Sequence, residues 1–394
     1  MPDTMPADPA DPTSPLRRDV EAALRAAWVP DGYTAPNTTV YPWLWLWDSC
    51  FHSIVWLALD DAARGLREME TALSTIDETG FVPHMGYGRE PDRSVELWGR
   101  RGSSSITQPP MYGHALAELV RAGVDVPDRL IERAARGLRF LLDRRPRIDG
   151  LIEVVHPWET GCDDSPRWDD FCPDGFALDR WRAHKMALLT TIERGPDGEP
   201  LHNPGFAVAP VGFNALVAWN ASELASVTHD SSLAREADEL AARLDDRFDP
   251  GLRTWVDAGS SEQGSGRVRT VGALAALLTC RDVGARRAAI SELVDEGAFA
   301  SAFGPRGVHL DEPTHAASSY WRGPVWPQLA YLLWVALSRA GGEESAAAET
   351  VRRSTIAGAI ESGLAEYWES GTGRGLGAIP QSWTGLALVL DRAG

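Results

Sequence analysis

Apolar residues along this chain recur mainly with the spacing of an α-helix. Within 130–141 and 233–248 they fall at i, i+3 or i+4 and i+7, so one face of each segment is apolar. Strand-like alternation is scarce, and 150–157 is the best short candidate. The pattern predicts helices over 16–27, 49–60, 62–77, 111–122, 130–141, 178–192, 212–227, 233–248, 268–278, 283–294, 323–339, 344–365 and 382–392.

Long segments rich in Gly, Pro, Trp and charged residues follow roughly every second helix, and short connections alternate with them. The long segments are 79–110, 150–176, 193–211, 247–267, 297–322 and 368–381. Helical hairpins arranged in a ring place their short turns at one end and their long loops at the other. The alternation therefore favours an all-α barrel of the (α/α) type, with its active-site loops at one end. A solenoid is the structural alternative, although no repeat of fixed period is present.

Composition narrows the class of protein. The chain has 394 residues, a net charge of −18 and no stripe of basic residues, which excludes a typical nucleic-acid binder. Its four cysteines form no C-x-x-C pair, and no metal-ligand spacing involves the histidines, so neither disulfides nor a metal is expected. The 16 tryptophans are unusually many, and about half of them should be core residues.

The ends and the hydropathy of the chain bear on its location. The acidic, proline-rich segment 1–15 lacks the features of a signal peptide and is expected to be a disordered tail before a single domain over 16–394. No run of about eighteen apolar residues is present, so no membrane span is predicted. These features indicate a cytoplasmic protein.

Five loop segments combine aromatic and polar side chains, namely 41–52, 103–110, 158–168, 318–328 and 366–383. Indole rings stack on the C–H faces of sugars, while carboxylates, amides and guanidinium groups bind sugar hydroxyls. A pocket built from these segments would suit a neutral, polyhydroxylated ligand.

Glycoside hydrolysis requires two carboxyl groups, and two of these segments supply candidates. "WETGCDDSPRW" (158–168) contains Glu159, Asp163 and Asp164. The C-terminal segment contains Glu366 and Glu369. From the loop alone, Asp163 is more simply a helix cap or an ion-pair partner of a nearby arginine, and a late-helix Glu366 is more simply a solvated residue.

The motifs "WLWDSCFH", "ITQPP", "HPWETGCDDSPRW", "DRW", "GFNAL", "YWRGPVW" and "GRGLGAIPQSWTGLAL" occur in this order from about residue 36 onward. With them the chain resembles the glycoside hydrolases that include bacterial glucosylglycerate and mannosylglycerate hydrolases and, more remotely, processing α-glucosidase I (glycoside hydrolase family 63-like). It is distantly similar to trehalases. The resemblance implies an (α/α)6 barrel that hydrolyses α-glycosidic bonds with inversion and without a cofactor.

The resemblance also implies roles for individual residues. Asp163 matches the general acid and Glu366 the general base, with Asp164 as the rival acid. Glu159 is expected to accept a sugar hydroxyl or to support Arg167. Residues matching the sugar subsite are Asp48, Gln108, Trp158, Trp321, Arg322, Trp326 and Gln381, and its walls are completed by Tyr41, Trp47, Tyr320 and Trp383.

One segment departs from the family pattern. Glycerate-specific members are expected to carry an arginine and a tyrosine before the D-R-aromatic motif, together with a short insertion. Here "CPDGFALDRW" (172–181) has Cys172 and Leu178 at those places. Since an arginine is the natural partner of a glycerate carboxylate, the sugar and the aglycone stay open. Arg167, Arg180 and Arg182 are possible substitutes.

The sequence therefore predicts an inverting α-glycosidase for a small α-glucoside or α-mannoside, such as a glucosylglycerate-like or α-1,2-linked disaccharide-like substrate. A small carbohydrate is the only partner expected. Two alternatives are an (α/α) barrel sugar epimerase or lyase, which would need paired histidines, and a carbohydrate-binding barrel without catalysis.

Overall fold

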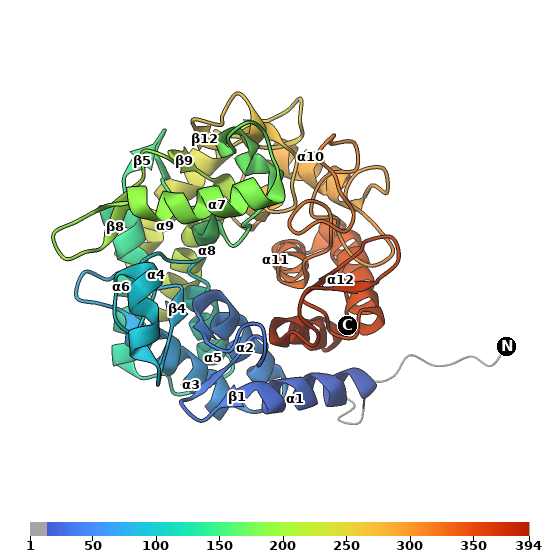
Figure 1. The fold of residues 1–394 in the computed structure, drawn as a ribbon. Helices are drawn as coiled ribbons and strands as arrows, with labels where there is room; N and C mark the ends of the chain where they lie inside the picture. The colour runs from blue at the N-terminus through green and yellow to red at the C-terminus, as the bar shows by residue number, and fades with distance from the viewer. Residues whose placement is uncertain (1–13, 394) are drawn as a thin grey trace.

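Twelve helical segments form two concentric rings in the computed structural model, which describes residues 14–393 (Figure 1). The inner ring consists of α2 (Leu46–Ala58), α5 (Tyr112–Arg121), α8 (Val211–Thr228), η8 (Ala273–Leu278), α11 (Pro327–Ser338) and α13 (Leu386–Asp391). The outer ring consists of α3 (Ala62–Ala72), α6 (Asp128–Arg139), α9 (Ser231–Asp245), α10 (Val283–Val294), α12 (Ser345–Glu361) and α1 (Pro15–Ala27).

Hydrophobic patterning explains which helices lie inside. In α2, α8 and α11 almost every residue is buried, as expected for helices that are enclosed on all sides. In α6 and α9 only one stripe is buried, and the other face is charged and exposed. Neighbouring inner segments contact one another in chain order, and α13 returns to contact α2, which closes the ring. The predicted (α/α)6 barrel is confirmed.

The segment 268–278 is the clearest error of the helix prediction. Only η8 is helical there, and it is a short 3₁₀ helix. The preceding backbone is bound elsewhere, because Val268 O accepts from the Arg167 side chain and Val271 N donates to Gly307 O. An α-helix begun at 268 would need those groups for its own hydrogen bonds.

Other helix ends differ by a few residues from the expected ranges. α2 begins at Leu46 rather than 49, so Asp48 lies in its first turn and does not cap it. The segment 323–339 becomes helical only at Pro327. Two α-helices lie outside the rings. The single turn α4 (Val95–Trp98) lies within the long segment 79–110, and α7 (Leu178–Leu188), expected over 178–192, crosses in front of the rings (Figure 1).

Short antiparallel strand pairs stiffen the loops. They are β1 (Trp28–Val29) with β2 (Tyr33–Thr34), β3 (Leu44–Trp45) with β4 (Met85–Gly86), β5 (Arg147–Ile148) with β6 (Leu151–Ile152), β7 (Glu193–Arg194) with β8 (Pro200–His202), β9 (Val208–Ala209) with β12 (Ala258–Gly259), β10 (Phe248–Asp249) with β11 (Thr254–Trp255), and β13 (Tyr367–Trp368) with β14 (Gly375–Leu376). The strand candidate at 150–157 contributes β6.

The expected tail 1–15 lies almost wholly outside the described residues. Ser14 and Pro15 already belong to the first helix, since the Ser14 hydroxyl accepts from Arg17 N and Pro15 begins α1. Within 14–393, no helix combines the length and the apolar character that crossing a bilayer would require.

Candidate functional site

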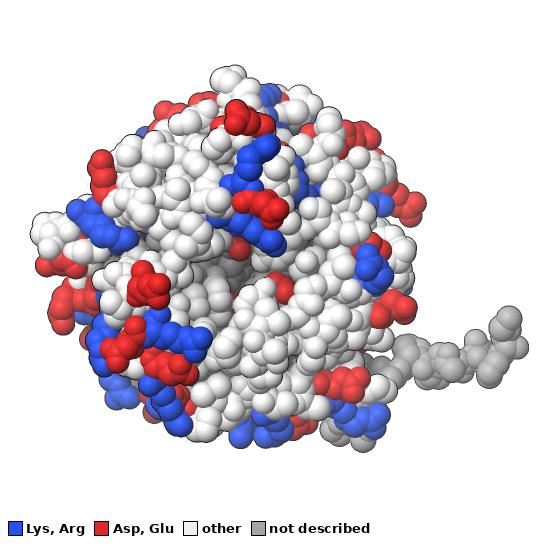
Figure 2. All heavy atoms as spheres, viewed as in Figure 1, with Lys and Arg blue, Asp and Glu red and all other residues white. Residues whose placement is uncertain are grey.

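A cavity of about 420 Å³ opens at the end of the barrel where the inner helices begin. Figure 2 shows it as a hollow in the middle of this face. Most of the long loops that precede inner helices contribute to it, which is the geometry expected of an (α/α) barrel active site. Its lining residues are Pro36, Val40, Tyr41, Trp43, Trp45, Trp47, Asp48, His84, Met85, Tyr87, Leu97, Trp98, Gln108, Trp158, Gly161, Asp163, Tyr320, Trp321, Glu366, Gln381 and Trp383.

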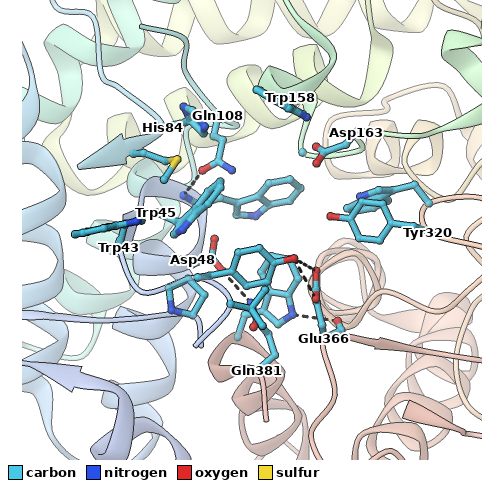
Figure 3. A pocket seen from close by; sticks show the side chains of 18 of the residues that line it. Trp43, Trp45, Asp48, His84, Gln108, Trp158, Asp163, Tyr320, Glu366 and Gln381 are labelled. Atoms are coloured by element: carbon cyan, nitrogen blue, oxygen red, sulfur yellow. Dashed lines mark hydrogen bonds between the residues drawn. The ribbon is translucent and has the colours of Figure 1, made fainter. Parts of the chain in front are cut away.

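The acid candidate Asp163 sits on one wall of this cavity (Figure 3). The loop reaches it through Gly161, whose φ is +71° and whose missing side chain leaves room for the Trp47 ring. Burial raises the pKa of Asp163 to about 7, while Lys185 opposes this shift and Asp164 adds to it. A carboxyl with this pKa is about half protonated at pH 7, whereas an ordinary aspartate is almost fully ionised.

Asp164, the rival acid, does not line the cavity. Its carboxylate is buried and pairs with the Lys185 ammonium. The suggested ion pair between Asp163 and Arg167 is also absent among the described contacts, since Arg167 binds Asp257 at 2.8 Å (Nη2–Oδ1). The neighbouring aspartates thus have different surroundings, and only Asp163 faces the cavity.

Glu366 faces the cavity from the opposite side, just before β13 (Figure 3). Its Oε2 accepts from Ala378 N at 2.9 Å, and its Oε1 accepts from the Tyr41 hydroxyl at 3.2 Å. Gly377 has a φ of +71°, and a Cβ there would come within 2.4 Å of Glu366 Oε2. Burial raises the pKa of Glu366, while the two hydrogen bonds act against it by stabilising the ionised form.

A buried polar floor lies between these two carboxyls. Gln381 Nε2 donates to Asp48 Oδ1 at 3.4 Å, and Trp47 N donates to Gln108 Oε1 at 3.1 Å. Gln381 Oε1 and the indole N–H groups of Trp45 and Trp47 are buried without a partner. Unpaired buried polar atoms are costly, and these three belong to residues that line the cavity.

Stacked aromatic rings form the wall beside the acid. The Trp321 and Trp326 rings lie 3.5 Å apart (centroid to centroid) at 3°, and Trp326 stacks in turn on Tyr367. Trp321 has a φ of 60°, a conformation that non-glycine residues rarely adopt. Such backbone strain is typical of functional sites, and it sets the Trp321 ring into the cavity wall.

Most of the predicted site residues meet at this cavity, but three do not line it. Glu159 is fully buried and binds Arg145 through both oxygens, Oε1–Nη2 at 2.6 Å and Oε2–Nη1 at 2.9 Å. Arg322 is paired with Asp169. Trp326 lies behind Trp321. Glu159 thus supports an arginine, which was the alternative to a sugar contact, but the arginine is Arg145 and not Arg167. Arg322 and Trp326 hold a neighbouring loop and ring in place.

Sequence reasoning missed several lining residues. Tyr41, Trp43 and Trp45 alternate along the segment before α2, and Trp47 lies in the first turn of that helix. All four side chains line the same cavity. This period of two is visible in the sequence and would have added Trp43 and Trp45. Nothing in the local sequence signals the contribution of 84–98, which supplies His84, Met85, Tyr87, Leu97 and Trp98.

The next question is whether histidines could act as the acid and base in this cavity. Of the described histidines, His84 alone lines the cavity. Burial lowers its pKa to about 3, so it is neutral, and its Nδ1 lies 2.6 Å from Ser104 Oγ. A paired-histidine epimerase mechanism finds no support in this arrangement.

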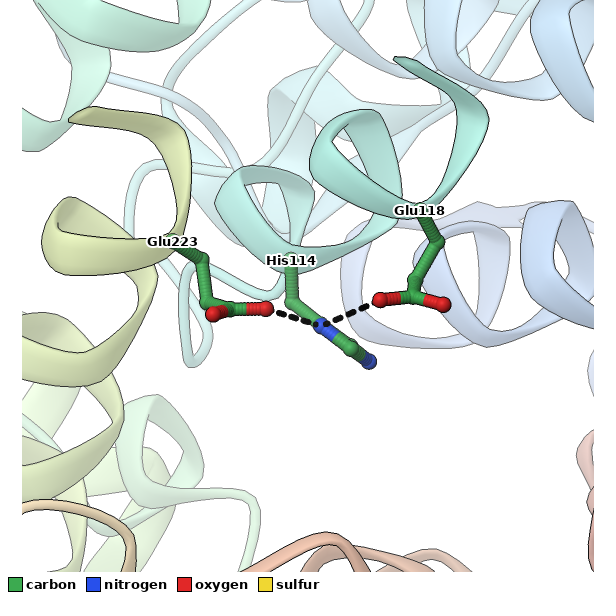
Figure 4. A group of neighbouring side chains, drawn as sticks. All are labelled: His114, Glu118 and Glu223. Atoms are coloured by element: carbon green, nitrogen blue, oxygen red, sulfur yellow. Dashed lines mark hydrogen bonds and ion pairs between the residues drawn. The ribbon is translucent and has the colours of Figure 1, made fainter. Parts of the chain in front are cut away.

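A group of potential metal ligands lies at the opposite end of the barrel. His114, Glu118 and Glu223 bring one ligand atom each within 4.8 Å of the others (Figure 4). Arg121 and Arg339 both form ion pairs with Glu118 and Glu223. The two guanidinium groups already balance the carboxylates, so this cluster is better suited to joining α5, α8 and α11 than to holding a cation.

Comparisons with known proteins agree with this geometry. The sequence model of the mannosylglycerate hydrolase MGH1-like glycoside hydrolase domain matches residues 41–384. The chain is 27% identical to a glucosylglycerate hydrolase of Mycolicibacterium hassiacum, covering 97% of this chain and 100% of the relative. It is 26% identical to a mannosylglycerate hydrolase of Rubrobacter radiotolerans, covering 97% and 98%. The crystal structure of a GH63 mannosylglycerate hydrolase from Thermus thermophilus, in complex with Tris and D-glycerate, shares the fold with a TM-score of 0.82 at 24% identity, covering 95% of this chain and 99% of that one.

Proposed function

The chain belongs to the mannosylglycerate hydrolase MGH1-like glycoside hydrolases, and from this premise we propose that it is an inverting α-glycosidase for a small α-glucoside or α-mannoside. The observation that carries the proposal is a pair of unlike carboxyls in one aromatic-walled cavity. One has a pKa raised to about 7 by burial, and the other accepts two hydrogen bonds that favour its ionised form. An acid and a base for glycoside hydrolysis need this difference.

Asp163 acts as the general acid. Its protonated carboxyl donates to the glycosidic oxygen as the bond to the anomeric carbon breaks, so the aglycone leaves as a neutral alcohol. Near pH 7 a large fraction of Asp163 carries the proton it must donate. Lys185 and Asp164 sit behind it as a buried ion pair and fix the loop.

Glu366 acts as the general base. It removes a proton from a water that attacks the anomeric carbon on the face opposite the departing oxygen, and the product therefore has the inverted configuration. The two carboxyls face the cavity from opposite sides (Figure 3), which supports this division of labour. Tyr41 and Ala378 N hold the carboxylate in place.

The buried polar floor binds the sugar that is released. Asp48, Gln108 and Gln381 offer acceptors and donors for its hydroxyls, and Trp47 and Trp321 offer ring faces for its C–H groups. A cavity of about 420 Å³ suits one sugar ring and a small aglycone better than a polymer. A cytoplasmic location remains a prediction from the sequence.

The experiment is a hydrolysis assay with variants of both carboxyls. The names of the relatives make glucosylglycerate and mannosylglycerate the first substrates to test, beside glucosylglycerol and kojibiose. Asp163→Asn should lose about 100- to 10,000-fold in kcat, the usual contribution of a general acid. It should keep much of its activity on an α-glycosyl fluoride, whose leaving group needs no proton. Glu366→Gln should be inactive on both.

The matched control is Asp164→Asn, one residue away. It should lower stability by unpairing Lys185 while keeping the requirement for a proton on Asp163. If Asp163→Asn cleaves alcohol-leaving glycosides normally, the acid is misassigned. If the wild-type chain binds sugars and cleaves none of them, the non-catalytic alternative replaces the proposal.

A further inference from the structure

The charge of the cavity differs from what a glycosylglycerate would require. Three carboxyl groups line it, those of Asp48, Asp163 and Glu366. Within the described chain, no Lys or Arg side chain lines it. Its single histidine, His84, is neutral because burial lowers its pKa to about 3. Burial raises the pKa of Asp48 well above its ordinary value and that of Asp163 to about 7, so the proposed base Glu366 is the carboxylate that would repel an anionic aglycone. No cation among the lining residues would offset this repulsion.

The arginines that could have substituted are engaged elsewhere. Arg167 is buried against Asp257. Arg180 donates to the carbonyl oxygens of Asp174 and Gly175. Arg182 is exposed on α7, 3.9 Å from Asp179 (Nη1–Oδ1). Basic side chains are visible on the face around the hollow (Figure 2), but none of these three reaches the cavity lining.

Arg322 follows the wall residue Trp321 and pairs with Asp169, and Lys185 and Arg93 are two further cations near the aromatic walls. Lys185 lies 5.7 Å from the Trp158 ring centroid and pairs with the buried Asp164. Arg93 lies over the Trp43 ring, outside the cavity lining, and pairs with Glu90 at 3.1 Å (Nη1–Oε2). All three positive charges are therefore already balanced.

The positions held by Cys172 and Leu178 supply no replacement. Cys172 is buried, and its thiol donates to Gly175 O. Leu178 begins α7 and is 41% exposed, and it does not line the cavity. The departure seen in the sequence thus corresponds to a cavity whose described lining offers no cation for a carboxylate.

Exposure divides the cavity into a polar floor and an apolar rim. Asp48 and Gln381 on the floor are at most 4% exposed, whereas Val40 and Leu97 on the rim are 56% and 41% exposed. Between them, the Trp43 ring packs against Tyr87 with centroids 5.2 Å apart. The group nearest solvent would therefore rest on apolar side chains and ring faces, which suit the C–H groups of an uncharged aglycone.

Resting on the proposed function, we propose that this enzyme cleaves α-glycosides of uncharged polyol or sugar aglycones and discriminates against the carboxylate of glycosylglycerates. The reaction is the hydrolysis described above: water supplies the hydroxyl of the free sugar and gives a proton to Glu366, and Asp163 gives its proton to the leaving alcohol. Proton exchange with solvent then returns both carboxyls to their starting states. Compared with hydrolysis of a glycosylglycerate, only the leaving alcohol differs, since it is uncharged.

The test compares two substrates that differ in one group of the aglycone, which is charged in one of them. Glucosylglycerate and glucosylglycerol share the sugar and a three-carbon aglycone, and a carboxylate in the first is a hydroxymethyl group in the second. The mannosyl pair serves in the same way. We expect kcat/KM to favour the neutral member by about tenfold or more, because like charges brought together in a site are strongly unfavourable. Equal or better cleavage of the acid would overturn the proposal.

Binding to the Asp163→Asn variant, measured by calorimetry, separates this inference from the proposed function. Tighter binding of the neutral member with no turnover by the wild-type chain would sink the proposed function and leave the charge discrimination standing. Tighter or equal binding of the acid, or no binding of either member, would refute the inference whatever the turnover.

A substitution at the cavity rim tests whether the missing cation causes the discrimination against the carboxylate. Leu97→Arg places a cation at the cavity mouth, and Leu97→Gln is its neutral control of similar length. The arginine variant should shift the preference toward glucosylglycerate by about fivefold relative to the glutamine variant, as expected for one new partly exposed charge pair. An unchanged ratio would show that a missing cation is not what disfavours the acid.

Discussion

Replacing Tyr41 by Phe tests how the base is held, because it removes one hydroxyl and keeps the ring. The Tyr41 hydroxyl donates to both oxygens of Glu366, at 3.2 Å to Oε1 and 3.4 Å to Oε2. Burial and the neighbouring Glu366 raise the pKa of Tyr41 above its ordinary value, so the hydroxyl stays protonated throughout any practical assay range. Its hydrogen bond favours the ionised carboxylate.

The size of the effect follows from this contact. A hydrogen bond to a charged group is worth about 1.5–3 kcal/mol, and long contacts such as these belong at the lower end. Since one pKa unit corresponds to about 1.4 kcal/mol, losing the bond should raise the pKa of Glu366 by about one unit. A general base must be ionised to act, so the acidic limb of the pH profile should move up by that amount.

The assay is the pH dependence of kcat/KM, which reports the free enzyme. Tyr87→Phe is the matched control, because Tyr87 lines the same cavity but its hydroxyl accepts from Trp98 Nε1 at 2.8 Å. We expect the acidic limb to move in Tyr41→Phe and to stay in place in Tyr87→Phe. A folded Tyr41→Phe enzyme with the wild-type acidic limb would refute the assignment of Glu366 as the base.

Three further predictions follow from other buried groups. The basic limb of the same profile should lie near pH 7, because Asp163 must be protonated and burial raises its pKa to about 7; a basic limb below pH 5 would contradict its role as the acid. Glu159→Gln leaves Arg145 unpaired and should lower the free energy of unfolding, measured by urea titration, by about 3–5 kcal/mol. A large rise in KM at undiminished stability would instead indicate that Glu159 contacts the sugar directly. Burial raises the pKa of Glu68 to about 8, so its contribution to stability is present below about pH 4.5 and is lost as the pH rises through 8. In Glu68→Gln, the free energy of unfolding should therefore fall less steeply with pH, by roughly 1.4 kcal/mol per pH unit. The same pH dependence of this free energy in both proteins would show that Glu68 does not have a raised pKa.

Much of the architecture was readable from the sequence because it rests on local patterns. Apolar stripes in 130–141 and 233–248 predicted helices with one buried face, and the alternation of long and short connections predicted the ring. The 3₁₀ helix η8 was not predictable, because its apolar spacing is that of an α-helix. What prevents an α-helix there is the use of its preceding backbone by Arg167 and Gly307, which are distant in the chain.

In the site, too, local motifs were readable from the sequence, whereas contacts between distant residues were not. Asp163, Asp48 and Gln381 were identified from motifs, and all three line the cavity. The partners that set their properties could not be found this way, since Gln381 donates to a residue 333 positions away and the Tyr41–Glu366 pair is separated by 325. Likewise, only the packed loop reveals that Glu159 faces Arg145 rather than a ligand.

The most direct test of the central claim is the configuration of the first sugar released. A proton NMR time course with a cleaved α-glycoside distinguishes the two anomers before they equilibrate. The assignment of Asp163 as acid and Glu366 as water-activating base predicts that the β-anomer appears first. Initial release of the α-anomer would mean retention, and Glu366 could then not be acting as the base of an inverting reaction.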